Sequence, residues 1–404
     1  MSTIYTMLVR NAYLRDPGDV FDIAIQGDRI VDISKEITGH GEIEIDACGK
    51  FVSPGLIDAH THMDKALTLG EGRQPKYWEM PYNRDRSIDI GLEYYSKATK
   101  EEVYEQAVKH GHMQVANGTV YTRTHVDVDS IARTKAVEGV IDAREELKDL
   151  IDIQIVAFAQ SGFYPDPEAE KLVGLANEMG CHLVGGVDPG TKEYNIEGSL
   201  DICFKIAREH DVDIDYHIME PGTLGVYILE RLARKTIENK YQGRVTASHA
   251  FSLGDAPLSW IDQAIPLFKE SGLKFVTCFT TTPPTFPVKK LYEAGIPIGC
   301  GSDNIRDFWI PFGNGDMVEG ALIETQRLSL SANRDLDLIW DMITGEGAKV
   351  LGIEKDYGLG VGKKADLVIL DANSPQWAII EQPKKLYVIK NGKIVAKNGV
   401  LAGS

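Results

Sequence analysis

The sequence lacks several features that would assign it to a specialised class of protein. Its five cysteines are scattered singly, without a C-x-x-C pair, which argues against a disulfide framework and against a thiolate zinc knuckle. No apolar run approaches the roughly 20 residues needed to cross a bilayer, and no basic segment leads into a long apolar stretch at the start. We therefore expect a cytoplasmic protein with reduced thiols and no membrane partner.

Positive charge is also scarce. The 43 Lys and Arg residues stand against 60 Asp and Glu residues, and the net charge is −17. Because nucleic-acid binding depends on Lys and Arg at the phosphates, we expect no nucleic-acid partner. A small heterocyclic or other weakly charged molecule is easier to accommodate. The 404 residues, 43% of them hydrophobic, are enough for one large α/β domain or for a large domain with a small one.

Short apolar, β-rich runs recur eight times between residues 51 and 303, and they alternate with segments whose apolar residues have helical spacing. Parallel βα units require this alternation. The strand candidates are 51–60, 120–126, 153–158, 182–187, 212–217, 244–249, 274–279 and 297–303. The helix candidates include 100–117, 132–150, 168–179, 200–210, 224–239 and 261–271. The sequence therefore predicts an α/β fold, a (β/α)8 TIM-type barrel.

The two ends of the chain have a different pattern. Alternating apolar and polar residues predict hairpins within 7–33 and 387–395, and 364–370 reads as a further strand. We expect both termini to join in a small β-sandwich, residues 1–50 plus 362–404, that the barrel domain of residues 51–361 interrupts. The polar segment 68–87 is predicted to cover the barrel mouth as a loop.

Chemically versatile side chains stand where the predicted strands end. They are His60 and His62 (first strand), His125 (second), Gln160 (after the third), His217 (fifth), His249 (sixth) and Asp303 (eighth). The active site of a (β/α)8 barrel is built at the carboxyl ends of its strands. We therefore expect these residues to converge in one site.

Three imidazoles and one carboxylate suit a single divalent cation and leave a position for water. Zn2+ is favoured, with Fe2+ as the alternative. The predicted ligands are His60, His62, His217 and Asp303. The other interpretations are a core histidine at 217 and a turn-capping aspartate at 303. A second metal is not expected, because the fourth strand ends without the bridging lysine that dinuclear sites in such barrels use.

A metal-activated water needs groups that move protons. Glu220 follows His217 by three residues, just past the strand, and is the predicted proton shuttle; a solvated loop carboxylate is the alternative. His249 is predicted to orient the metal hydroxide. The H-x-E and P-C-x-x-C pattern of nucleotide-type zinc deaminases is absent, which excludes that fold.

Several motifs carry a resemblance to a known family. They are His60-Thr-His-Met-Asp-Lys65, Thr124-His-Val-Asp127, Tyr216-His-Ile-Met-Glu220, Ser248-His-Ala250 and Gly301-Ser-Asp-Asn-Ile-Arg-Asp-Phe-Trp309. Through them the chain resembles the cytosine-deaminase-like group of the amidohydrolase superfamily, across the barrel and both terminal β segments. Within that group it is most similar to an s-triazine branch that removes alkylamines.

The resemblance implies the same four metal ligands, the shuttle at Glu220 and the orienting histidine at His249. It also implies substrate contacts from Gln160, which would grip a ring amide edge, from Lys65, and from Asn304 and Trp309. Ordinary polar roles for Gln160 and Lys65 remain alternatives. A homo-oligomer, with a tetramer favoured, is expected on the same ground.

Two positions depart from the patterns of these relatives. Met219-Glu220 differs from the histidine and aspartate expected in the triazine branch, and Asn304 replaces a second aspartate of cytosine deaminase. These departures leave open whether ammonia or an alkylamine leaves.

The functional hypothesis is a metal-dependent aminohydrolase acting on C–N bonds of cyclic amidines. It would remove an exocyclic amino or alkylamino group from an s-triazine or pyrimidine-like ring, such as cytosine or isocytosine, by metal-hydroxide attack on the ring carbon. The alternative enzyme is a ring-opening, hydantoinase-like hydrolase, against which the missing fourth-strand lysine counts. An inactive scaffold of the same fold is the alternative from another class, although no ligand is missing.

Overall fold

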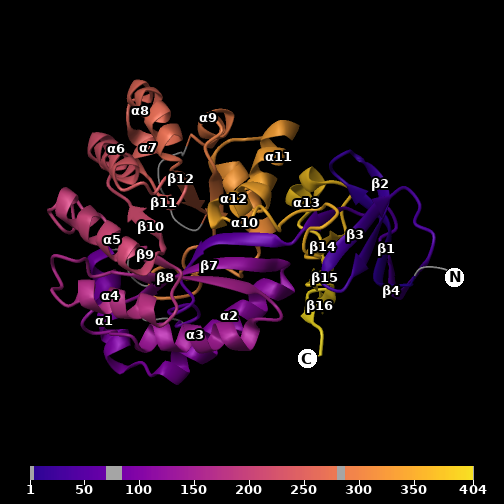
Figure 1. The fold of residues 1–404 in the computed structure, drawn as a ribbon, viewed down its shortest axis with the longest axis horizontal. Coiled ribbons are helices and arrows are strands. Elements are labelled where there is room, and N and C mark those ends of the chain that lie inside the picture. The colour runs from indigo at the N-terminus through magenta and orange to yellow at the C-terminus, as the bar shows by residue number, and fades with distance from the viewer. Residues whose placement is uncertain (1–3, 70–83, 280–286, 404) are drawn as a thin grey trace.

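An eight-stranded parallel sheet curls into a barrel at the centre of the larger part of the molecule (Figure 1). The computed structural model describes residues 4–69, 84–279 and 287–403. In chain order the barrel strands are β6 (Leu56–Thr61), β7 (Thr119–Asp127), β8 (Asp152–Phe158), β9 (Leu183–Gly185), β10 (Asp213–Ile218), β11 (Val245–His249), β12 (Lys274–Cys278) and β13 (Ile298–Gly301). Nearly every strand residue is buried, as expected for a parallel sheet covered on both faces. The predicted (β/α)8 barrel is confirmed.

The barrel closes between its first and last strands. The backbone N–H of Asp303 donates to the carbonyl oxygen of His60 at 2.8 Å, and Thr61 Oγ1 donates to the carbonyl oxygen of Asp303 at 3.0 Å. Gly301 permits this approach, because a Cβ at that position would lie 2.5 Å from the Cβ and carbonyl oxygen of His60. Asp58 holds the same seam, since its carboxylate accepts the backbone N–H of Ser302 at 3.0 Å and its hydroxyl at 2.5 Å.

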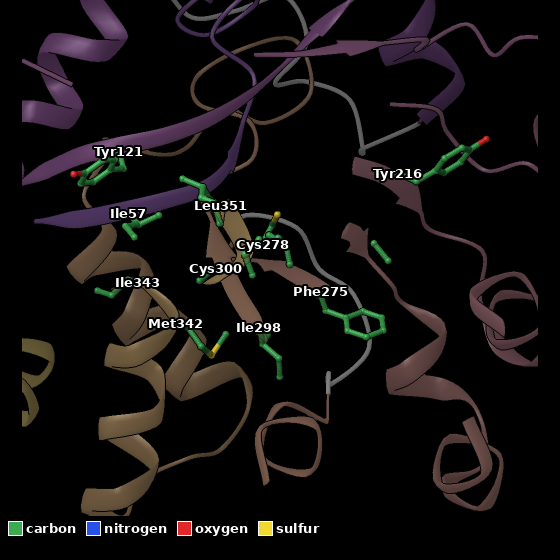
Figure 2. Close-up of a cluster of buried hydrophobic side chains, with 14 of the residues drawn as sticks. Ile57, Tyr121, Tyr216, Phe275, Cys278, Ile298, Cys300, Met342, Ile343 and Leu351 are labelled. Carbon is green, nitrogen blue, oxygen red and sulfur yellow. The ribbon is translucent and has the colours of Figure 1, made fainter. Parts of the chain in front are cut away.

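Helices follow the strands, and most of them pack on the outer face of the barrel. They are α1 (Arg84–Lys97), α2 (Lys100–Ala116), α3 (Lys135–Leu147), α4 (Ala169–Glu178), α5 (Ile196–His210), α6 (Gly222–Glu238), α7 (Ser252–Asp255), α8 (Leu258–Ser271), α9 (Val288–Glu293), α10 (Met317–Arg327), α11 (Asn333–Met342), α12 (Gly345–Leu351) and α13 (Pro375–Glu381). Figure 2 shows part of the core, where Ile298 and Cys300 of β13 face Met342 at the end of α11. This packing fixes the strands whose carboxyl ends carry the site.

The termini form a separate β unit of two sheets. The first has the order β3-β2-β1-β4, and the second the order β17-β16-β15-β14-β5. Their strands are β1 (Ile4–Leu14), β2 (Asp19–Gln26), β3 (Arg29–Ser34), β4 (His40–Asp46), β5 (Val52–Pro54), β14 (Leu367–Leu370), β15 (Lys385–Lys390), β16 (Lys393–Lys397) and β17 (Val400–Leu401). One apolar cluster contains Val9 and Ile23 of the first sheet together with Leu367 and Ile389 of the second. The expected terminal β unit is therefore present, while the exact domain limits stay a prediction.

Two expectations need comment. The single strand expected at 51–60 is in fact two strands, because β5 pairs with β14 in the terminal sheet while β6 begins the barrel. A continuous apolar run cannot reveal that its two halves belong to different sheets. Most of the expected mouth loop, residues 70–83, lies outside the described residues, and Ser87 already belongs to α1. No helix in the described ranges is long and apolar enough to span a membrane.

Candidate metal centre

A cavity of about 340 Å³ opens at the carboxyl ends of the barrel strands. Most of the predicted site residues line it: His62, Lys65, Gln160, His217, His249, Asp303, Asn304 and Trp309. Met219 and Phe251 add apolar walls. The barrel therefore brings together residues that are up to about 250 positions apart in the chain.

Three of the predicted ligands are closely packed imidazoles. The ring centroid of His60 lies 5.3 Å from that of His62 and 4.7 Å from that of His217. The centroids of His62 and His217 are 5.6 Å apart. The alternation of side chains along β6 explains the first pair, since residues two apart on a strand point to the same face.

The fourth predicted ligand lies against this group. Asp303 Oδ1 is 3.3 Å from His62 Nε2 and 3.7 Å from His60 Nε2. Two atoms bonded to one tetrahedral zinc at about 2.0–2.1 Å lie about 3.3 Å apart. The spacing therefore fits donors that share one cation.

Two of the imidazoles are held with Nε2 directed at the site. His60 Nδ1 lies 3.0 Å from Ser248 Oγ, and His62 Nδ1 lies 3.1 Å from the carbonyl oxygen of His125. Bonds of this kind at one ring nitrogen fix the tautomer that presents the other nitrogen to a metal. Among the described residues, His60 Nε2 and both ring nitrogens of His217 have no hydrogen-bond partner although they are buried. Buried polar atoms normally have partners, so this donor set fits a cation.

The protonation states agree with metal binding. Burial lowers the pKa of His60 and His217 well below the usual range of histidine, and it lowers the pKa of His62 to about 4. For Asp303, burial opposes ionisation, but its contacts with His62 and other nearby histidines bring its pKa below the ordinary value. Neutral imidazoles and an ionised carboxylate are the forms that bind divalent metals.

Below the candidate metal ligands lies a chain of charged and polar groups. Ser248 Oγ donates to Asp215 Oδ1 at 2.6 Å, and Arg123 Nη1 donates to Asp215 Oδ2 at 2.8 Å. This chain links the orientation of His60 to a buried ion pair that the sequence analysis did not identify. The available signal in the sequence was an arginine, Arg123, inside the predicted barrel strand 120–126.

Two other residues come close enough to compete as ligands. The ring centroid of His125 lies 4.0 Å from that of His60, but its Nε2 is 3.4 Å from Asp215 Oδ1. Cys278 forms a possible donor group with His60 and His249, but burial raises the pKa of its thiol well above the usual range. A protonated thiol is a poor ligand. His60, His62 and Asp303 are therefore a chemically better donor group for a cation than the group that contains Cys278.

Glu220 is buried at the end of β10, next to the site, but it does not line the cavity. Its Oε1 accepts the backbone N–H groups of Gly190 at 2.9 Å and Thr191 at 3.2 Å. Burial and the neighbouring carboxylate of Asp188 raise the pKa of Glu220 to about 8. The solvated loop carboxylate considered above does not fit this position.

His249 stands at the carboxyl end of β11, with its ring centroid 4.9 Å from those of His60 and His217. Its backbone has a φ of 70°, and Asp303 has a φ of 58°. Left-handed backbone at residues other than glycine carries strain and recurs at functional sites. Both residues therefore lie where local geometry is set by the site rather than by the strand.

The predicted substrate residues form the polar part of the cavity. Lys65 is buried and donates to Asp127 Oδ1 at 2.6 Å. Although burial opposes its charge, Asp127 and Asp64 raise the pKa of Lys65, so the ammonium persists. Asn304 Nδ2 donates to Asp307 Oδ2 at 2.7 Å.

Comparison with known proteins places the chain in a family. The model of the amidohydrolase family matches residues 44–165 and 168–396. The N-isopropylammelide isopropyl amidohydrolase of Pseudomonas sp. (strain ADP) is 64% identical over 401 residues, which cover 99% of this chain and 100% of that protein.

Two solved structures share the fold over almost the whole chain. The N-isopropylammelide isopropylaminohydrolase of Burkholderia multivorans ATCC 17616 has a TM-score of 0.90 at 32% identity, covering 98% of this chain and 99% of its own. The 5-methylcytosine deaminase of Klebsiella pneumoniae, liganded with 5-fluorocytosine, has a TM-score of 0.87 at 28% identity with the same coverage.

Proposed function

The chain belongs to the amidohydrolase family, and from that premise we propose that it is a metal-dependent aminohydrolase of s-triazine or pyrimidine-like rings. The observation that carries the proposal is the group of buried imidazole nitrogens of His60 and His217, which have no hydrogen-bond partner among the described residues and lie beside Asp303. A matching cavity lies directly over this group. The similarity to an isopropylammelide hydrolase and to a cytosine-type deaminase supports the same substrate class.

We propose that His60, His62, His217 and Asp303 would hold one divalent cation: His60, His62 and Asp303 form one compact donor group, and the His217 ring lies against that of His60. Zinc is favoured because it accepts N and O donors. The bound cation would supply a water that is acidic enough to react near neutral pH. A ring carbon between nitrogens is the electrophile, and an amine leaves as the carbon gains an oxo group.

Glu220 is the proposed proton carrier. Glu220 would take a proton from the reacting water and deliver it to the leaving amine, and the raised pKa that burial and Asp188 give this carboxyl helps it to hold the proton in between. The backbone N–H groups of Gly190 and Thr191 fix one of its oxygens. His249, buried beside His60, is proposed to orient the reacting water.

The cavity is divided between polar and apolar walls. Lys65, Gln160 and Asn304 supply hydrogen-bonding groups for ring oxygens and nitrogens, while Met219 and Phe251 offer apolar surface. An apolar wall suits an alkylamino substituent better than a bare amino group. We therefore place N-isopropylammelide ahead of cytosine as the substrate.

A substrate panel tests the function. Metal-replete protein is incubated with cytosine, isocytosine, ammelide and N-isopropylammelide, and released amines and ring products are identified by mass spectrometry. Isopropylamine with an intact ring is the expected result, and ammonia alone would make the protein a deaminase of primary ring amines. Ring-opened product would overturn the assignment, and a protein that neither retains added metal nor turns over any ring would be an inactive scaffold.

The Glu220→Gln substitution tests the proton carrier. We expect kcat to fall about 100- to 10,000-fold, because the amide cannot transfer a proton, with metal content unchanged. Glu193→Gln is the matched control, since Glu193 is also buried but hydrogen-bonds Ser199 and the backbone of Phe163 instead. Unchanged turnover in Glu220→Gln would remove this residue from the mechanism.

We also propose that the protein is cytoplasmic and forms a homo-oligomer, with a tetramer favoured. The support is the resemblance to the wider enzyme group and large apolar side chains left exposed, such as Leu258 and Trp377. Sedimentation of the purified protein would decide the state of assembly.

A further inference from the structure

One carboxylate outside the predicted site controls the direction of a cavity side chain. Asp307 is 2% exposed, and its two oxygens have different partners. Oδ1 accepts the backbone N–H groups of Trp309 at 2.8 Å and Ile310 at 3.1 Å, whereas Oδ2 accepts Nδ2 of Asn304 at 2.7 Å. The backbone N–H of Asp307 closes the same turn by donating to the carbonyl oxygen of Ile310 at 3.0 Å.

This arrangement decides which end of the Asn304 amide faces the cavity. Burial raises the pKa of Asp307 to about 7, so above that pH the side chain is a carboxylate that can only accept hydrogen bonds, and the NH2 group of Asn304 must turn toward it. The amide oxygen is then the atom left for the cavity that Asn304 lines, and within the described residues it accepts no hydrogen bond. Asn304 therefore offers an acceptor to a ligand, although its amide carries both kinds of group.

A hydrogen-bond donor also lines the cavity. The ammonium of Lys65 is close enough to Asp307 for each charge to influence the other, and Lys65 also lines the cavity. A ring lactam edge places a C=O next to an N–H. Lys65 can donate to such a carbonyl while Asn304 accepts from the adjacent N–H.

We propose that Asp307 is a positioning residue that fixes Asn304 as a hydrogen-bond acceptor, so that the site selects rings with an N–H beside a ring carbonyl. The inference rests on the proposed function and specifies its substrate as a lactam tautomer. It gives Asn304 a definite role. This residue stands where cytosine deaminase has a second aspartate, and the carboxylate of Asp307 makes its amide a hydrogen-bond acceptor without adding a charge to the cavity.

The arrangement makes an unusual prediction for Asp307→Asn. The oxygen of the new amide must stay with the two backbone N–H groups, because its NH2 group cannot accept them. That NH2 group then faces Asn304, whose amide must turn over and direct its own NH2 group into the cavity. The substitution keeps the shape of the turn and inverts the polarity of the group presented to substrate.

Restoring an acceptor at residue 304 should restore binding. In the double variant Asn304→Asp/Asp307→Asn, one oxygen of the new carboxylate accepts from the amide at 307 and the other faces the cavity. Steady-state kinetics with N-isopropylammelide at pH 8 are measured for the wild type, both single variants and the double variant. We expect KM to rise about 10- to 100-fold in Asp307→Asn, with a smaller change in kcat, and to return to within about fivefold of the wild type in the double variant.

The controls separate this role from a merely structural one. Asp166→Asn is the matched control, because Asp166 is also a buried turn aspartate whose oxygens accept the backbone N–H groups of Ser130 and Glu168, away from the cavity. Its KM should not change. Metal content and thermal midpoint are recorded for every variant, so that loss of metal or of fold is recognised directly.

The inference is overturned if KM is unchanged in Asp307→Asn. It is also overturned if the rise in KM persists in the double variant Asn304→Asp/Asp307→Asn. If wild-type protein turns over no ring of the panel, the proposed function itself fails. Binding of a ring lactam to the metal-replete variants by calorimetry then decides the role of Asp307 independently, because the same loss and rescue should appear in the Kd.

Discussion

Two buried polar layers lie one below the other inside the barrel, and they differ in how well their hydrogen bonds are satisfied. Arg123, Asp215 and Thr246 of the lower layer stand two residues before His125, His217 and Ser248 of the upper one. In a strand, residues two apart share a face, so each pair belongs to the same interior column.

The polar groups of the lower layer are held by the hydrogen bonds of Arg123. The guanidinium of Arg123 donates to Asp215, to Thr246 Oγ1, to Gln154 Oε1 and to the carbonyl oxygen of Val350, at distances of 2.8–3.1 Å. In the upper layer, as far as the described residues extend, His60 Nε2 and both ring nitrogens of His217 have no hydrogen-bond partner. A satisfied network serves stability, whereas a cluster of unsatisfied imidazole nitrogens beside a carboxylate fits a bound cation.

The largest effect should follow from His217→Ala, which removes a donor from the upper layer. We expect loss of stoichiometric metal and a fall in kcat/KM of at least about 1,000-fold, or about 4 kcal/mol of transition-state stabilisation, while the fold persists. Elemental analysis and a thermal scan without added metal check this. Full metal occupancy in the variant would place the ligand set elsewhere.

Arg123→Met is expected to lower the free energy of unfolding rather than to act directly on metal binding. It leaves Asp215 buried without its ion-pair partner, and breaking such a pair costs about 3–5 kcal/mol. Denaturant unfolding monitors the loss. The double variant Arg123→Met/Asp215→Asn should recover part of it, because the remaining group is neutral; recovery of nothing would contradict a charge-based explanation.

Ser248→Ala cuts the connection between the two layers. Ser248 is hydrogen-bonded to both His60 Nδ1 and Asp215 Oδ1, so its loss frees the His60 ring to turn. Metal affinity should drop about 10- to 100-fold, measured by competition with a chelator. Ser252→Ala serves as control, since the buried Ser252 hydroxyl has no hydrogen-bond partner within the described residues. Equal effects of the two substitutions would break the proposed link.

The smallest expected effect concerns His110 of α2, a buried histidine outside both layers. Burial lowers its pKa to about 3, so between roughly pH 3 and 6.5 the unfolded chain binds a proton that the folded protein does not. The free energy of unfolding therefore falls with decreasing pH in that window, by up to about 1.4 kcal/mol per pH unit. Denaturation of His110→Leu and wild type at pH 7, 6 and 5 should show a weaker pH dependence for the variant.

His40→Gln is the control for that series, because the His40 side chain is 76% exposed and should not alter the pH dependence. If His110→Leu shows the wild-type slope, His110 is protonated in the folded protein. It would then require a buried anionic partner, and it would not be the neutral side chain that its burial implies.

Much of the site was visible in the sequence because its signals are local. His60 and His62 are two residues apart at a strand end, and Glu220 lies three residues after His217. Residues this close in the chain stay close together in the folded protein. Eight apolar runs in alternation with helical segments similarly predict the barrel, since burial on both faces requires continuous apolar strands. The convergence of the strand ends then follows from the fold itself.

Other features were fixed only in three dimensions. The run 51–60 gave no sign that Val52–Pro54 would pair with Leu367–Leu370, more than 300 residues later. Ser248 reaches His60 across 188 residues, and Arg123 reaches Asp215 across 92. Local patterns report which face of a strand is buried, but they carry no information on which distant polar atoms will meet there.

The sequence by itself thus determined the kind of chemistry: the donor types, their placement at strand ends and the carboxylate that follows them. Tertiary structure decided the protonation and direction of these groups. Burial among other imidazoles keeps His60 and His217 neutral, and the proximity of Asp307 turns the Asn304 amide. Both effects depend on desolvation and on hydrogen-bond geometry, which exist only once the strands have closed into a barrel.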